Sequence, residues 1–290
     1  MTFQQIEYLI HGDILPFSIN DFRISDKLIL QKVYGDGYQD STWGEHTGHV
    51  KAFVGVEFDE KGDYFKRADD YLTLFLHLYT LETGQPYVKF SGGASINLDD
   101  LSNLGVKKID SFHGFNQIEY LSPPRERDMI LISNRKAVFE ELECEYEALM
   151  SSPFGLSLQF FYDAVMANHR RRLELAVVNF MIAAETLVIK EDRSHRQLVS
   201  KRIGVLASEK PDEIDEVYRE MKRLYGVRSA IVHGGGKKAS PYDVQALFRY
   251  LKKGIQKRLL LRETPKVELV RKLIEVFDDR TLFDTLLTID

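Results

Sequence analysis

Hydrophobic and polar residues alternate along part of the first half of the chain, as they do in a β-strand that buries one face. Residues 49–58 place an apolar side chain at every second position from Val50 to Phe58, which is the period of a half-buried strand. Residues 29–34 and 86–96 are weaker strand candidates. Residues 67–82 carry apolar side chains at helical spacing and predict one helix in this half.

From Asn134 onward the apolar residues recur every three or four positions, which is typical of amphipathic helices. Pro241 stands at a first helical position, Ser240 is placed to cap that helix, and Asp243 lies in its first turn. Short connections between long helices favour antiparallel neighbours. The predicted helices span residues 134–150, 156–168, 170–190, 195–208, 212–233, 241–262, 266–277 and 280–288.

These patterns predict an α+β protein with two parts. Residues 1–133 form a mixed, strand-rich N-terminal module, and residues 134–290 form an all-α, antiparallel helical bundle. Twelve of the nineteen glycines lie before residue 115, which fits a turn-rich sheet in the first part.

Two charged residues interrupt the apolar stripes of the predicted bundle. The stripe of helix 212–233 continues from Tyr225 to Arg228, and the residues three and four positions from Glu185 in helix 170–190 are all apolar. A buried charge is costly unless it is paired and hydrogen-bonded. We therefore expect Glu185 and Arg228 to approach each other inside the bundle.

His233 ends helix 212–233 and is followed by three glycines, which readily adopt the left-handed conformation that terminates helices. Ser229, four residues earlier, shares the face of His233. Arg228, five residues earlier, diverges from His233 by about 140° and lies about 7.5 Å from it along the axis. One helix therefore separates the two head groups, whereas two copies meeting across a two-fold axis can bring them together.

Charge is distributed unevenly along the 290 residues, whose net charge is −5. Residues 1–150 hold 14 Lys and Arg against 25 Asp and Glu, a net charge of −11, and residues 151–290 hold 25 against 19, a net charge of +6. An acidic half joined to a basic half indicates two modules with different partners.

The chain shows no feature of a secreted or membrane protein. Its first residues contain neither a basic stretch nor a long apolar run, so we expect no leader. The most apolar segment, residues 173–189, is interrupted by charges and is shorter than the roughly 20 apolar residues of a membrane span. The single cysteine, Cys144, excludes an intramolecular disulfide and suits a reducing compartment, so we expect a cytoplasmic protein.

The segment LYGVRSAIVHGGG, residues 224–236, resembles the HEPN superfamily (higher eukaryote and prokaryote nucleotide-binding), which is marked by an Arg, four to six residues and then a His near a helix end. The wider match is to the Apea-like branch and covers residues 153–262. It comprises a helix carrying a Glu (FMIAAETLVI), a helix like VSKRIGVLAS, and then Tyr, Arg-Ser and His-Gly. The matching residues are Glu185, Tyr225, Arg228, Ser229, His233 and Gly234.

The resemblance implies a homodimer in which two such motifs share one cleft and cleave RNA without a metal or other cofactor. The 2′-hydroxyl of RNA would attack its own phosphate and leave a 2′,3′-cyclic phosphate. His233 would serve as general base or acid, and Arg228 would clamp the phosphate. Ser229 and Tyr225 would orient the substrate or the imidazole, and Glu185 would hold Arg228.

The resemblance also implies a role in phage defence or in a toxin or stress system, with the N-terminal module sensing a trigger, binding a protein partner or restraining the nuclease. Non-catalytic interpretations stay open. A Glu–Arg pair inside a bundle can be structural, and a His at a helix end is favoured by the helix dipole. Some members of the superfamily are scaffolds or regulators that do not cleave RNA.

Clusters of basic residues can extend an electropositive track for RNA, although such runs are also common on solvated helix ends. Glu45, His46 and His49 have a spacing that a metal ion can use, but no further ligand is obvious nearby, so we expect no metal. The residues of the basic clusters include Arg170, Arg171, Arg193, Arg196, Lys201, Arg202, Lys237 and Lys238.

Overall fold

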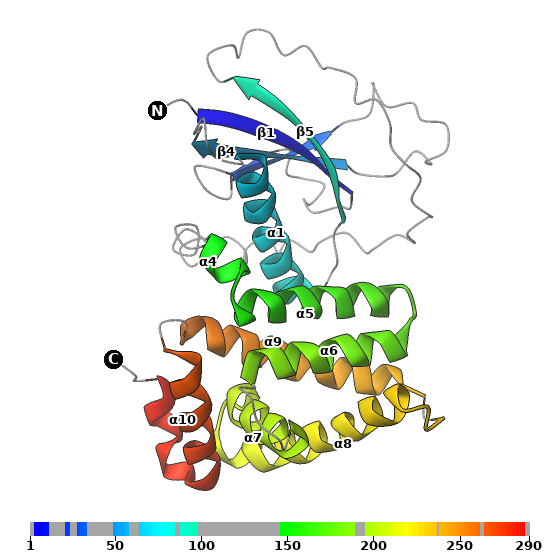
Figure 1. Ribbon diagram of the computed structural model, residues 1–290, viewed down its shortest axis with the longest axis vertical. Coiled ribbons are helices and arrows are strands. Elements are labelled where there is room, and N and C mark those ends of the chain that lie inside the picture. The colour runs from blue at the N-terminus through cyan, green and yellow to red at the C-terminus, as the bar shows by residue number, and fades with distance from the viewer. Residues whose placement is uncertain are drawn as a thin grey trace. The chain divides into compact units, whose positions relative to one another are not determined.

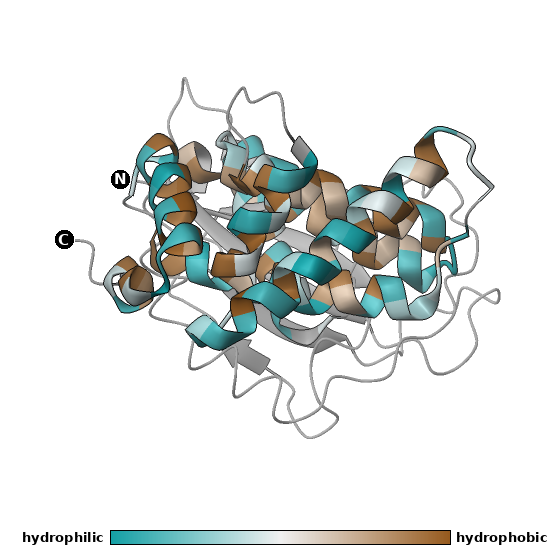
Figure 2. Cartoon of the chain, turned by 90° about the horizontal axis from the view of Figure 1, so that it is seen from below, coloured by the Kyte–Doolittle hydropathy of each residue, from teal (hydrophilic) through white to brown (hydrophobic). Residues whose placement is uncertain are grey.

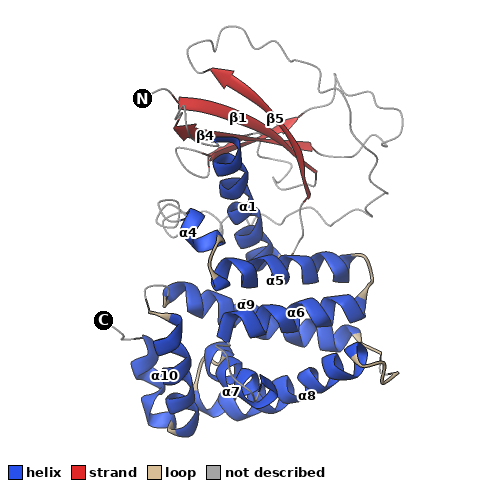
Figure 3. Cartoon of the chain, viewed as in Figure 1, coloured by secondary structure: helices blue, strands red, loops and turns tan. Residues whose placement is uncertain are grey.

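The computed structural model describes residues 3–11, 21–23, 28–33, 49–57, 64–84, 88–97, 146–188, 195–236, 238–261 and 264–287. The chain divides into two compact units, Met1–Met150 and Ser151–Asp290. In the described part, the first unit contains strands and helices, whereas the second contains helices alone (Figure 3). The predicted boundary after residue 133 falls outside the described residues, as does Cys144.

The strands of the first unit form an antiparallel sheet in the order β2-β3-β4-β1-β5 (Figure 1). Strand β1 pairs with β4 so that Phe3 lies opposite Glu57 and His11 lies opposite His49. Strands β3, β4 and β5 coincide with the three strand candidates in the sequence. The strands are β1 (Phe3–His11), β2 (Asp21–Arg23), β3 (Leu28–Val33), β4 (His49–Glu57) and β5 (Val88–Asn97).

Helix α1 (Tyr64–Thr83) follows β4 in the chain and contacts that strand. It covers the predicted helix at residues 67–82. Its Tyr71, Leu74 and Phe75 are buried, as the apolar stripe predicts. The short helix α4 (Tyr146–Met150) also contacts α1 and belongs to the first unit.

The second unit is an all-α helical bundle, which confirms the prediction for the C-terminal half. The predicted helices from 156–168 to 266–277 match α-helices of this unit within a few residues at each end, and the one predicted at 280–288 is a 3₁₀ helix. Of the helix predicted at 134–150, only residues 146–150 are described, as α4 in the first unit. Helix α5 packs against α6, α7 packs against α8, and α9 contacts α5, α6, α7 and α8. The helices are α5 (Pro153–His169), α6 (Leu173–Val188), α7 (His195–Ala207), α8 (Ile214–Val232), α9 (Pro241–Leu260) and α10 (Lys266–Asp278), with 3₁₀ helices η2 (Pro211–Glu213) and η3 (Arg280–Leu287).

Aromatic side chains from three helices meet in the core of the bundle. The ring of Phe161 on α5 lies 5.3 Å from Phe180 on α6 and 5.4 Å from Phe248 on α9, between ring centroids. Hydrophobic residues are concentrated on the inner faces of the helices, and hydrophilic residues are concentrated on their outer faces (Figure 2). Burial of these faces, rather than intrinsic helix propensity, provides most of the stability of such helices.

Local sequence signals fix where the helices begin and end. The hydroxyl of Ser240 accepts a hydrogen bond from the backbone N–H of Asp243, whose carboxylate accepts one from the N–H of Ser240, so the predicted cap is confirmed as a full capping box. Helix α5 ends with Arg171 in the left-handed conformation at φ 57°. This turn delays the start of α6 to Leu173, instead of the predicted residue 170.

None of the helices described in either unit is long and apolar enough to cross a membrane.

Candidate functional site at the end of helix α8

Helix α8 is buried along one face for most of its length and emerges from the core at its end. Its buried residues are Ile214, Val217, Met221, Leu224 and Val227. From Arg228 to Ile231 every residue is half-buried, and Val232 and His233 are exposed. The residues that the sequence singled out therefore lie where α8 reaches the surface.

The glycines after His233 terminate α8 as predicted. The backbone N–H of Gly235 donates to the carbonyl oxygen of Ala230 at 2.7 Å, and the N–H of Gly234 donates to that of Ile231 at 3.4 Å. Gly234 has φ 71°. This is the Schellman arrangement, which needs the left-handed conformation at the residue after the cap. It leaves His233 as the C-cap residue with an exposed side chain.

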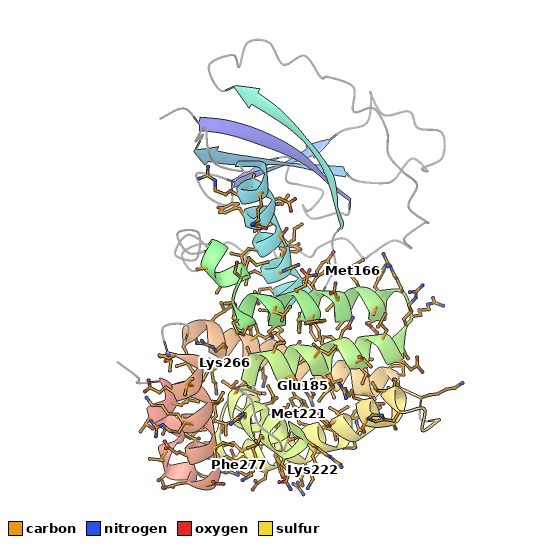
Figure 4. All side chains as sticks on the ribbon, viewed as in Figure 1. Met166, Glu185, Met221, Lys222, Lys266 and Phe277 are labelled. Carbon is orange, nitrogen blue, oxygen red and sulfur yellow. The ribbon has the colours of Figure 1, made fainter. Side chains whose placement is uncertain are left out.

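Glu185 on α6 is bound by Tyr225 on α8. The Tyr225 hydroxyl donates a hydrogen bond of 2.7 Å to Oε1 of Glu185. Burial, together with the hydrogen bond to the Glu185 carboxylate and its charge, raises the pKa of Tyr225 to about 12, and the nearby charge of Arg228 partly opposes this rise. Glu185 and its helix α6 are labelled in Figures 4 and 1. Glu185 and Tyr225 thus link α6 and α8 about two turns before the end of α8.

The expected approach of Glu185 and Arg228 produces no ion pair between them in the described part of the chain. Among the described residues, Arg228 forms neither a hydrogen bond nor an ion pair. Its guanidinium carbon lies 5.9 Å from the centroid of the Tyr225 ring, a loose cation–π contact. Its Nε is shielded from solvent and has no hydrogen-bond partner. The side chain of α8 that binds the Glu185 carboxylate is therefore Tyr225, and not Arg228 as the sequence pattern predicted.

Ser229 and His233 lie on the same face of α8, as their spacing predicts, and the backbone N–H of His233 donates to the carbonyl oxygen of Ser229 at 3.0 Å. Arg228 precedes Ser229 directly, so it points about 100° away around the axis. One copy of the helix therefore places Ser229 and His233 on one side and Arg228 on another, and Tyr225, four residues before Ser229 and three before Arg228, lies between them around the axis.

A network at the base of the turn after α8 was missed by the sequence analysis. Nη2 of Arg223 on α8 lies 2.7 Å from Oδ1 of Asp243 on α9, and Asp243 also accepts hydrogen bonds from Ser240. Burial alone would raise the pKa of Asp243, but the hydrogen bonds from Ser240 and Arg223 outweigh burial and hold it below its usual value. The capping box was readable from the sequence, but its arginine partner on the preceding helix was not. This network fixes the two helices on either side of the turn that follows His233.

The basic residues predicted to bind RNA lie at different places in the bundle. Arg170 and Arg171 are exposed at the turn between α5 and α6, and Lys238 is exposed after α8, whereas Lys237 lies outside the described residues. Arg202 is a correction, because it is only 6% exposed and its Nη1 donates to the carbonyl oxygen of Val188 at 2.9 Å. It closes the end of α6 instead of facing solvent, so it is removed from the RNA track.

The candidate metal ligands Glu45, His46 and His49 lie outside the part of the chain whose side chains are described. Glu45 and His46 are not among the described residues, and of His49 only the backbone is described. In the rest of the described chain, no group of three or more His, Cys, Asp or Glu residues could hold a metal ion.

No protein-family model, curated protein or solved structure matches the chain.

Proposed function

We propose that the chain is a metal-independent endoribonuclease of the HEPN type, of the Apea-like branch, whose active site forms at the end of α8. The observation that carries the proposal is the uncommitted guanidinium of Arg228. Its Nε is shielded from water without a hydrogen-bond partner, which is unfavourable unless a ligand supplies an acceptor. A phosphate of RNA offers that acceptor, and a guanidinium presents its donors in a fork that fits phosphate oxygens.

The reaction uses groups of the substrate and of α8 alone. The 2′-oxygen forms a bond to phosphorus while the bond from phosphorus to the 5′-oxygen breaks. A base removes the proton of the 2′-hydroxyl, and an acid donates a proton to the leaving 5′-oxygen. The exposed imidazole of His233 suits both proton transfers near neutral pH. Arg228 stabilises the negative charge on the phosphate oxygens, and Ser229 orients the substrate or the imidazole.

Glu185 acts through Tyr225 in this proposal. It holds the phenol by the 2.7 Å hydrogen bond, and the phenol lies next to the Arg228 guanidinium. Glu185 is thus a positioning residue. Because its carboxylate binds Tyr225 and not Arg228, the N–H donors of Arg228 stay available to the substrate.

The active form is a homodimer. Arg228 and His233 project from different sides of one helix, so a second α8 is needed to supply the missing group to each half-site. Apolar side chains exposed near the end of α8 are suited to such pairing. Val232 is 50% exposed, and Tyr242 at the start of α9 is 62% exposed. The alternative is a non-catalytic dimer that acts as a scaffold or regulator. It applies if the chain dimerises in a way that keeps the two α8 ends apart, because Arg228 and His233 of one helix then have no partner groups to complete a site.

We place this activity in phage defence or in a toxin or stress system. The first unit would then bind the trigger or a protein partner, or restrain the nuclease. RNA is the substrate, and no cofactor is required.

The test is cleavage of mixed RNA by the purified full-length chain in EDTA. Wild type should cleave, whereas Arg228→Ala and His233→Ala should each lose at least a hundredfold in rate, the scale of a lost acid–base or charge-stabilising group. Arg271→Ala, an exposed arginine on α10 that pairs with Glu275, serves as control and should keep full activity. Cleavage that survives in both active-site variants, or that EDTA abolishes, refutes the mechanism. A chain that forms the dimer and binds RNA but never cleaves it supports the scaffold instead.

A further inference from the structure

One face of α8 carries polar and cationic groups as far as its end. Lys222, Gly226, Ser229 and His233 lie within about 60° of one another around the axis, because their spacing is four, three and four residues. Between Lys222 and His233 the helix contains no acidic residue. Glu220 is on the far side of the helix and bonds to Arg223. Asp215, near the start of the helix, pairs with Arg280. From Lys222 to His233 this face therefore carries no carboxylate of its own helix.

A neighbouring helix adds an arginine to this face. Nε and Nη2 of Arg196, on α7, donate to the carbonyl oxygen of Lys222 at 3.2 and 3.1 Å. Arg196 also lies over Gly226, where an added Cβ would stand 3.5 Å from its Nη2. At the other end of α7, a Cβ added to Gly204 would stand 3.3 Å from the carbonyl oxygen of Ile214 and 3.4 Å from the Cβ of Tyr218. Helix α7 therefore runs antiparallel to α8, and it begins over Gly226, ahead of Ser229 and His233.

Arg196 is held in place but keeps donors available. A guanidinium has five N–H groups, and the two bonds to the Lys222 carbonyl use two of them. The side chain is exposed, and no carboxylate pairs with it in the described part of the chain. Ser229 is one helical turn further along α8, about 4.5 Å from Gly226 along the axis, and His233 is about 10.5 Å from it.

We propose that Arg196 is a substrate-binding residue that holds a backbone phosphate of the RNA strand beside the phosphate that is cleaved. The inference rests on the proposed nuclease function and extends it. Arg228 points away from the His233 face, so within one copy Arg196 supplies the guanidinium on that face. Lys222 continues the track, and Figure 4 shows it at the outer edge of the bundle. The bidentate anchor on the Lys222 carbonyl fixes the guanidinium before RNA arrives, which reduces the entropy lost on binding.

The test separates binding from chemistry. Arg196→Gln should raise the KM for RNA about tenfold and change kcat less than twofold, since the residue touches a neighbouring phosphate and not the reacting atoms. In a His233→Ala background, which prevents cleavage, the same substitution should weaken RNA binding about tenfold. It should also reduce the slope of log K against log salt by about 0.7, the value for one phosphate contact on a single strand.

Three variants complete the design. Arg196→Lys keeps the charge and should recover part of the affinity. Lys222→Gln removes a charge from the same face but leaves the backbone carbonyl that anchors Arg196, and it should weaken binding severalfold. Arg271→Gln removes an exposed arginine on α10 and should change neither KM nor the salt slope. Far-ultraviolet circular dichroism during melting shows whether each variant keeps its helices.

The outcomes also distinguish this inference from the proposed function. If wild type cleaves RNA and Arg196→Gln behaves like Arg271→Gln, Arg196 is not a substrate contact, and the nuclease stands. A fall in kcat with an unchanged KM would likewise overturn the inference, because it indicates a displaced α8. RNA binding that depends on Arg196 without any cleavage would retain the contact surface and remove the nuclease. Wild type that neither binds nor cleaves RNA overturns both.

Discussion

The hydroxyl of Tyr225 donates a 2.7 Å hydrogen bond to Oε1 of Glu185, and this bond, rather than an ion pair with Arg228, joins the charged residue of α6 to α8. The arrangement leaves Arg228 beside the phenol ring with its donors uncommitted. The distinction matters because an arginine held by a carboxylate is a structural group, whereas an arginine without an acceptor is prepared to bind an anion.

Removing the Tyr225 hydroxyl should weaken the bundle. Tyr225→Phe leaves the half-buried Glu185 carboxylate without this donor, so the free energy of unfolding should fall by about 1 kcal/mol. The measurement is urea unfolding followed by far-ultraviolet circular dichroism. Tyr218→Phe is the matched control on the same helix, because the Tyr218 ring packs edge-on to Phe277 at 5.1 Å and its hydroxyl has no hydrogen-bond partner among the described residues. Equal losses in the two variants would contradict the assigned role of the bond.

The Arg223–Asp243 pair should make stability depend on pH in the acid range. The pKa of Asp243 is held below its usual value of 3.8 in the folded chain. A lowered carboxyl pKa contributes stability that is fully present above the unfolded value and is lost as the pH falls through the folded one. At pH 7, Asp243→Asn should therefore be less stable than wild type by about 1 kcal/mol. This difference should shrink once the pH falls below about 4, and a difference that is constant from pH 7 to pH 2 would contradict the pairing.

Two glycines inside helices should respond differently to alanine. At Gly204 a Cβ would lie 3.3 Å from the carbonyl oxygen of Ile214 and 3.4 Å from the Cβ of Tyr218, so α7 and α8 would have to separate. Gly204→Ala should lower the free energy of unfolding by about 1–2 kcal/mol despite the better helix propensity of alanine. At Gly254 the nearest atoms are 3.7 and 3.8 Å away, so Gly254→Ala should be neutral or stabilise by up to about 1 kcal/mol. Thermal melting of both variants checks the pair, and the reverse order would show that the α7–α8 crossing is not tight.

The turn between α5 and α6 offers a stabilising substitution. Arg171 adopts φ 57°, a conformation that costs an L-residue energy but not a glycine. Arg171→Gly should therefore raise the free energy of unfolding by about 0.5–1 kcal/mol. Arg170, at φ −79°, is the neighbouring control, and Arg170→Gly should give no gain. The same chemical denaturation compares them, and a loss of stability in Arg171→Gly would show that its side chain holds the turn.

The helical half was predictable because its signals are local. Apolar residues at helical spacing, the proline that begins α9, and the glycines after His233 act within a few residues of each helix. Strand β1 was not among the predicted strands, although Ile6, Tyr8 and Ile10 alternate with polar Gln5 and Glu7. This alternation is typical of a strand and would have predicted β1.

Contacts between helices were not predictable in the same way. The spacing of apolar residues shows which side chains share a face, but it does not show which residue on the next helix meets them. It pointed to Glu185 and Arg228 while the contact forms through Tyr225. Arg202 resembled a surface charge, although its acceptor is a carbonyl oxygen at the end of α6. The bond from Arg196 to the carbonyl of Lys222 leaves no trace in either segment alone.

The central claim is that α8 uses the 2′-hydroxyl of RNA as the nucleophile, and the chemistry of the cleaved ends tests it most directly. Mass spectrometry of a short RNA cut by wild type in EDTA should show a 2′,3′-cyclic phosphate on one fragment and a 5′-hydroxyl on the other. An RNA with a single 2′-deoxy sugar at the cleavage position should resist cleavage there. A 3′-hydroxyl with a 5′-phosphate, or cleavage of the deoxy position at the normal rate, would contradict the account.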